Sequence, residues 1–212
     1  MHNLLNRSML LRNMDCQRWL LFNKPVSVPF KKLTGQRAVV LASRWFELKK
    51  QEAGASVSVG VEIAKPFIGA TVNVLGTMAG IKPVVGKPYI KNENEAKGDI
   101  SAKVGVMGDY SGSISLSFSR SCALALVKGM LGDDIEDVMR DTADAVGEIT
   151  NMISGQSRAG LTEHGIHLQG STPTIIFGDK HSIMHMAKVS IVAIPFTTDH
   201  GAFCLEFCLE KS

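Results

Sequence analysis

The apolar residues between Asp141 and Leu161 recur about every 3.6 positions, which is the period of an amphipathic α-helix. On such a helix Asp144, Glu148 and Asn151 follow one another at i, i+4 and i+7, so they share one polar face. The opposite face collects the apolar side chains of Ala145, Val146, Ile149, Met152 and Ile153. We therefore predict a long helix with one side in the core and the other in solvent.

Two glycines, Gly147 and Gly155, lie inside this predicted helix next to its polar face. Because a glycine in a helix interior costs about 1 kcal/mol relative to alanine, they suggest a surface kept low so that another molecule can approach closely. Two alternatives stay open. Polar residues on a helix are most often simply solvated, and the glycines could make room for a neighbouring element of the same chain.

Other stretches of the chain have the period of a helix or the alternation of a strand. The helical patterns cover about 63–78 and about 121–130, and the strand patterns cover 83–91, 100–107, 112–118, 174–177, about 184–196 and 202–209. The turn signal Gly108-Asp109 joins two of these strands into an antiparallel hairpin. The order of elements predicts an α+β fold, a six-stranded, mostly antiparallel sheet with long helices packed on it.

The composition is that of an ordinary globular protein. Of the 212 residues, 45% are hydrophobic and 20% are charged, and no apolar run reaches the eighteen or so residues of a membrane span. The four cysteines form no dense framework, so we expect a reducing compartment and a cytoplasmic location.

The charge divides the chain into two parts. Residues 1–56 hold ten Lys/Arg and three Asp/Glu, a net charge of +7, which leaves 13 and 17, or −4, for residues 57–212. We interpret 1–56 as a basic N-terminal extension that is disordered or not native, and 57–212 as the functional domain. A basic arm that contacts nucleic acid or a membrane is the alternative for 1–56.

The sequence of the predicted helix also resembles a sequence motif of a known protein family. Asp144-Ala-Val-Gly-Glu-Ile-Thr-Asn-Met-Ile153 resembles the signature helix of the CheC/CheX/FliY phosphatases of bacterial chemotaxis, and within that family it is most similar to CheX. Supporting similarities are Pro66-Phe-Ile68, Ala70-Thr-Val-Asn-Val-Leu75, Thr77-Met-Ala-Gly-Ile-Lys-Pro83 and Pro173. The resemblance runs from about Val61 to Lys211.

The resemblance implies a function for the polar face. Such proteins hydrolyse the aspartyl phosphate of a phosphorylated CheY-type response regulator, with Asn151 orienting the attacking water and Glu148 pairing with the regulator's lysine. Asp144, Gly147 and Gly155 would belong to the surface that binds the regulator. The Mg²⁺ would sit in the regulator, so we expect this chain to bind no metal or cofactor. The resemblance also implies a homodimer joined through the sheets, and we expect no nucleic-acid or membrane partner.

The family is built on an internal pseudo-two-fold repeat, and the sequence contains a trace of it. Gly69-Ala-Thr-Val-Asn73 echoes Gly147-Glu-Ile-Thr-Asn151, with Ala70 in place of the glutamate. We therefore predict one working site per chain, in the second half.

Other hypotheses have less support. A non-catalytic adaptor or flagellar-switch module of the same fold would bind a regulator without hydrolysing its phosphate, and it would not need the amide of Asn151. A zinc site would draw on four histidines that lack a recognised ligand spacing: His164, His167, His181 and His185. Cys204 and Cys208 share one face of a predicted strand, for which burial is the ordinary explanation.

Overall fold

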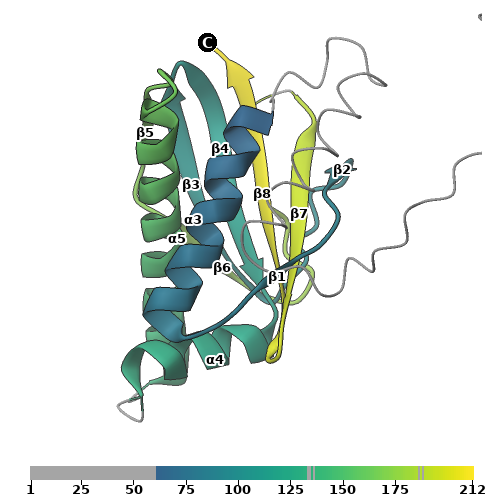
Figure 1. The fold of residues 1–212 in the computed structure, drawn as a ribbon. Coiled ribbons are helices and arrows are strands. Elements are labelled where there is room, and N and C mark those ends of the chain that lie inside the picture. The colour runs from purple at the N-terminus through teal and green to yellow at the C-terminus, as the bar shows by residue number, and fades with distance from the viewer. Residues whose placement is uncertain (1–60, 133–134, 136, 186, 188) are drawn as a thin grey trace, which may run out of the picture.

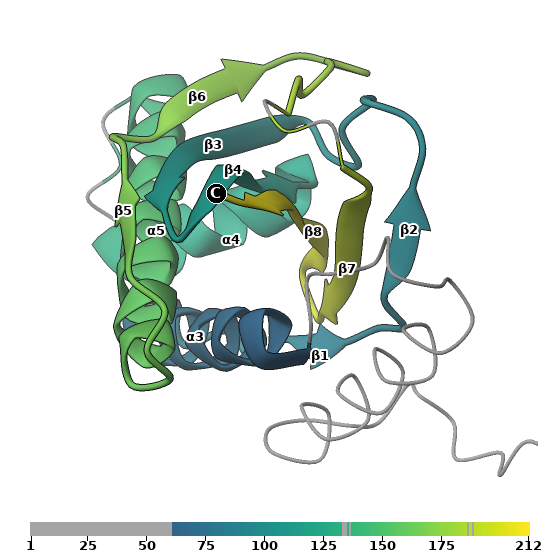
Figure 2. The same ribbon diagram turned by 90° about the horizontal axis from the view of Figure 1, so that it is seen from above.

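In the part of the chain that the structure describes, three helices pack on one face of an eight-stranded sheet (Figures 1 and 2). The computed structural model describes residues 61–132, 135, 137–185, 187 and 189–212. The helices are α3 (Val61–Ala79), α4 (Arg120–Leu131) and α5 (Val138–Thr162). The strands are β1 (Val84–Val85), β2 (Tyr89–Lys91), β3 (Ile100–Gly108), β4 (Tyr110–Phe118), β5 (Leu168–Gly170), β6 (Thr174–Phe177), β7 (Ile191–Thr198) and β8 (Gly201–Lys211). The predicted extension 1–56 lies outside the described residues.

The sheet is antiparallel at every described pairing. Its order is β1-β7-β8-β4-β3-β5, with β2 also paired to β7 and β6 also paired to β3. The predicted hairpin is confirmed: β3 and β4 pair from Ile100 with Phe118 to Val106 with Gly112. The α+β class is confirmed as well.

Three details of the strand prediction were wrong. The stretch 83–91 forms two short strands, because Gly86-Lys87-Pro88 interrupts it and a proline cannot donate to a strand ladder. The predicted strand 184–196 begins only at Ile191. The short β5 was not predicted, since three residues are too few to give an alternating pattern.

Alternation along the long strands places the core between the sheet and the helices. In β4, Ile114, Leu116 and Phe118 are buried and belong to the main hydrophobic cluster. Phenylalanines from three strands stack there: the ring centroids of Phe118 and Phe203 lie 5.1 Å apart, and those of Phe196 and Phe203 lie 4.7 Å apart. Such offset pairs add to the stability that burial provides. The same hydrophobic cluster contains residues of α5, so it joins this helix to the sheet.

An exposed polar stripe on helix α5

Helix α5 begins with a cap that its own sequence supplies. The Asp137 carboxylate accepts hydrogen bonds from the backbone N–H groups of Met139 at 3.0 Å and Arg140 at 3.1 Å. The Asp141 carboxylate accepts one from the Asp137 N–H at 3.0 Å. These bonds satisfy donors that a helix start leaves open, and carboxylates there are favoured by the helix dipole. The acidic first turn thus stabilises the N-terminal end of the 25-residue helix that contains the predicted site.

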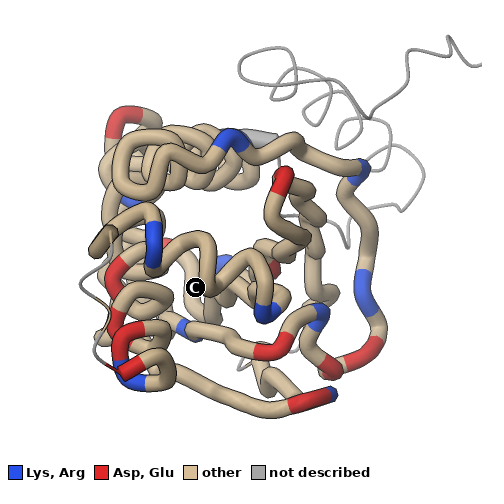
Figure 3. The backbone as a smooth tube through the Cα atoms, turned by 90° about the horizontal axis from the view of Figure 1, so that it is seen from below, with Lys and Arg blue, Asp and Glu red and all other residues tan. Residues whose placement is uncertain are grey.

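The amphipathic prediction for α5 is confirmed. Val146, Ile149 and Ile153 are fully buried. Asp144, Glu148 and Asn151 are exposed, and together with the half-exposed Gly155 they form a row that we call the α5 stripe. Acidic positions gather on the side of the molecule where α5 lies (Figure 3).

The polar side chains of the α5 stripe have no partner within the described part of the chain. No hydrogen bond or ion pair there involves Asp144, Glu148 or Asn151, although Arg140 and Asp141 in the turn before them are paired at 3.4 Å. A rigid helix therefore presents two carboxylates and one amide to solvent with their hydrogen-bonding capacity unused.

Gly147 and Gly155, the two glycines predicted to allow a close approach, differ in their surroundings. A Cβ on Gly147 would lie only 3.3 Å from Cδ1 of Ile175 in β6. The packing of β6 against α5 is therefore sufficient to explain the glycine at this position. A Cβ on Gly155 would have only Nη2 of Arg158, at 4.0 Å, as its nearest neighbour. The packing of the described residues does not require a glycine at position 155.

A hollow of about 500 Å³ borders the N-terminal end of the α5 stripe. Its lining is Met130, Leu131, Arg140, Asp141, Asp144, Ala145 and Glu148. Leu131 is a large apolar residue with 42% of its surface exposed. No sequence pattern singled out Leu131 as a functional residue, although its place just before Gly132, at the end of a helix that leads towards the signature helix, was a usable signal.

Helix α3 lies beside α5 and carries the other half of the predicted repeat (Figures 1 and 2). Asn73 is exposed, and its Nδ2 donates to Oε1 of Gln156 on α5 at 3.4 Å. Ala70, at the position that corresponds to Glu148, is 5% exposed. The first copy of the motif therefore has a partnered amide and a buried alanine, whereas the second copy has two polar groups without a partner among the described residues.

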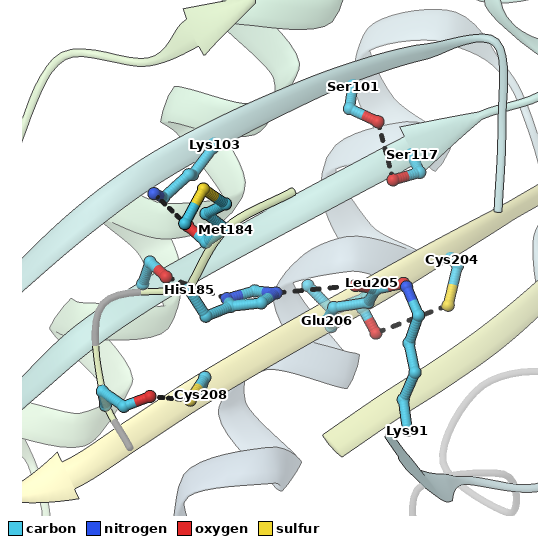
Figure 4. Close-up of polar contacts among 12 residues, drawn as sticks. Lys91, Ser101, Lys103, Ser117, Met184, His185, Cys204, Leu205, Glu206 and Cys208 are labelled. Atoms are coloured by element: carbon cyan, nitrogen blue, oxygen red, sulfur yellow. Dashed lines mark hydrogen bonds and ion pairs between the residues drawn. The ribbon is translucent and has the colours of Figure 1, made fainter. Parts of the chain in front are cut away.

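His185, Cys204 and Cys208 lie on the face of the sheet away from the helices (Figure 4), and His181 bonds to Ser101. The other two candidate histidines, His164 and His167, are exposed in the segment between α5 and β5. Lys91 Nζ lies 2.6 Å from Oε1 of the buried Glu206, and His185 Nδ1 lies 2.9 Å from Ser113 Oγ. Burial, with the nearby Glu206 carboxylate, raises the pKa of Cys204 to about 12, so this thiol is inert at neutral pH. Among the described residues, no three His, Cys, Asp or Glu side chains are placed to hold a metal ion.

Comparisons with known proteins agree with this architecture. The family described as chemotaxis phosphatase CheX matches residues 100–197. A Thermotoga maritima protein named CheY-P phosphatase CheX is 30% identical over 117 residues, which cover 55% of this chain and 76% of that protein.

Two solved structures have the same fold. The chemotaxis protein CheX from Desulfovibrio desulfuricans is 61% identical, with a TM-score of 0.68 over 70% of this chain and 99% of that one. CheX in a CheX–CheY–BeF3–Mg²⁺ complex from Borrelia burgdorferi is 23% identical, with a TM-score of 0.60 over 70% and 98% of the two chains. In the described part of this chain, none of the helices has the length and apolarity that a membrane crossing requires.

Proposed function

Because the chain belongs to the CheX family of chemotaxis phosphatases, we propose that it hydrolyses the aspartyl phosphate of a CheY-type response regulator in the cytoplasm. The observation that carries this proposal is the α5 stripe, where Glu148 and Asn151 lie exposed one helical turn apart and have no partner among the described residues. An amide is neither an acid nor a base, so a site built on this pair depends on a partner that brings the reacting groups.

The reaction needs little from this chain except positioning. A water oxygen attacks the phosphorus, the bond between phosphorus and the aspartyl oxygen breaks, and the products are the free carboxylate of the regulator and inorganic phosphate. Phosphoryl transfer depends mainly on orientation and on stabilisation of charge. The Asn151 amide can accept a hydrogen bond from the water through its oxygen and donate one to a phosphoryl oxygen through its nitrogen.

Glu148 has a different part in the proposal. A carboxylate one helical turn before the amide can pair with a lysine of the regulator when the two proteins dock. Such a pair, once desolvated, fixes orientation as well as affinity. Mg²⁺ belongs to the regulator in this proposal, in keeping with the Mg²⁺ and BeF3 of the Borrelia complex. The name of the Thermotoga relative supports the same substrate.

The test is the decay of a phosphorylated CheY-type regulator from the same organism, measured with increasing concentrations of the protein. Wild type should accelerate the decay, and Asn151→Ala should reduce the saturating rate about 100-fold while it still binds the regulator. Asn73→Ala is the matched control, and it should stay within twofold of wild type.

The adaptor hypothesis gives a different result in the same experiment. If the regulator binds but decays no faster with wild type than without it, the protein is a binding module and the proposed hydrolysis is wrong. The homodimer implied by the resemblance also belongs to this proposal, and sedimentation velocity at several concentrations would test it.

A further inference from the structure

The hollow at the N-terminal end of the α5 stripe has two kinds of surface. Met130 and Leu131 at the end of α4, together with Ala145 of α5, provide apolar atoms. Asp144 and Glu148 border the same hollow and are exposed. A recess with an apolar part and unpaired carboxylates suits a partner that offers an apolar side chain beside a basic one.

The charges in this hollow are not all available to a partner. Asp141 accepts a hydrogen bond from the Asp137 N–H at 3.0 Å, and its other oxygen lies 3.4 Å from Nε of Arg140. The charges of Arg140 and Asp141 therefore offset each other. Asp144 and Glu148 have no such partner among the described residues, so the hollow as a whole favours a cation.

The hollow is also continuous with the proposed active surface, because Glu148 belongs to both. Other elements pack along the two flanks of α5. Asn73 of α3 contacts Gln156 further along one flank, and Ile175 of β6 lies against Gly147 on the other. A regulator whose lysine pairs with Glu148 would therefore place its neighbouring residues over the hollow.

We propose that this hollow is the part of the docking surface that selects the regulator, and that it receives an apolar side chain flanked by a basic residue, with Leu131 as the specificity-determining contact. The inference rests on the proposed function, since it assumes a regulator docked on the α5 stripe. It goes beyond that function because it assigns recognition to α4, outside the signature helix. Leu131 acts on docking and has no part in the chemical step.

The experiment compares Leu131→Asp with Met107→Asp. Met107 is 70% exposed in β3, next to the β3–β4 turn, where it pairs with Gln169 of β5, so it offers an even more exposed apolar position away from the hollow. Decay of the phosphorylated regulator is followed against protein concentration. Leu131→Asp should raise the half-saturating concentration at least fivefold and leave the saturating rate within twofold, whereas Met107→Asp should change neither value.

Three results would overturn the inference. One is an unchanged half-saturating concentration for Leu131→Asp, another is an equal effect of Met107→Asp, and the third is a loss confined to the saturating rate. If Leu131→Asp fails to fold by circular dichroism, Leu131→Ser replaces it and should raise the half-saturating concentration at least threefold.

Failure of the proposed function gives a separate result. If wild type does not accelerate decay at all, binding of the regulator loaded with beryllofluoride and Mg²⁺ decides the inference by itself. Binding that is weakened at least fivefold by Leu131→Asp and unaffected by Met107→Asp supports the hollow as the recognition site without catalysis. Equal binding by wild type and Leu131→Asp rejects it.

Discussion

Helices α3 and α5 lie side by side on the same sheet and contain related five-residue strings, yet only α5 presents a usable polar surface. In α5, Glu148 and Asn151 are exposed and have no partner in the described chain. In α3, Ala70 is 5% exposed, and the Asn73 amide donates to Gln156. The two asparagines occupy matching positions of the motif but differ in their contacts. Asn151 has no partner among the described residues, whereas Asn73 is hydrogen-bonded within the fold.

We infer from this difference that the first position of the motif can hold a glutamate only where that position faces solvent. A glutamate can occupy position 148 because that position faces solvent. The corresponding position 70 faces the interior, where an unpaired carboxylate is costly. The absence of a glutamate at position 70 therefore agrees with the packing as well as with the prediction of one site per chain, and the two halves can be tested against each other.

The largest expected difference between the halves concerns the two amides. Asn151→Asp keeps the size of the side chain, but it replaces the donor N–H₂ with a negatively charged oxygen that would face a phosphoryl group. We expect the saturating rate of regulator decay to fall about 10³-fold, the upper range for the loss of a well-placed donor. Asn73→Asp should leave it within twofold. Comparable losses in the two variants would mean that α3 also takes part in the reaction.

The next largest effect should appear in stability. Ala70→Glu would create the Glu-x-x-Asn pattern in α3, and it would place a carboxylate at a position that is 5% exposed. We expect the free energy of unfolding to fall by about 3 kcal/mol, measured by urea denaturation. In an Asn151→Ala background the change should not restore phosphatase activity. A stable Ala70→Glu variant with recovered activity would show that the first site was lost by substitution alone.

The loss of the glutamate on α5 should affect docking more than chemistry. Glu148→Gln keeps the shape of the side chain and removes the charge that would pair with the regulator's lysine. We expect the half-saturating concentration to rise about tenfold, which corresponds to about 1.4 kcal/mol, with a smaller change in the saturating rate. High salt should weaken docking of wild type more than docking of the variant, and equal salt dependence would contradict the ion pair.

Much of this picture could be predicted from sequence because both helices and long strands repeat their patterns over many residues. The period of α5 placed Asp144, Glu148 and Asn151 on one exposed face, and the structure confirms it. The alternation in β4 gave the correct hairpin with β3. These patterns arise from local geometry and burial, which a single chain records directly.

What could not be predicted depends on contacts between distant parts of the chain. The side chain that leaves little room for a Cβ at Gly147 belongs to Ile175, 28 positions later. The hydrogen-bond partner of Asn73 is Gln156, which lies on another helix. The hollow beside Glu148 needs Leu131 from α4, which no pattern within α5 could supply. The start of β7 was misplaced because the sequence 184–190 has strand-like character, whereas β7 begins at Ile191 and the His185 side chain bonds to Ser113 on the face of the sheet away from the helices.

The smallest expected effect distinguishes two helix glycines that have open space around them. Gly155→Ala and Gly69→Ala should each stabilise the protein by about 0.5–1 kcal/mol, because alanine is the better helix former and a Cβ at either position meets no close obstacle. Only Gly155 lies on the α5 stripe, where we propose that the regulator docks. Gly155→Ala should therefore raise the half-saturating concentration about threefold while Gly69→Ala leaves it unchanged. Stabilisation by both variants without any change in docking would place Gly155 outside the interface, and the docked regulator would then lie nearer the N-terminal end of α5, over Asp144 and the hollow.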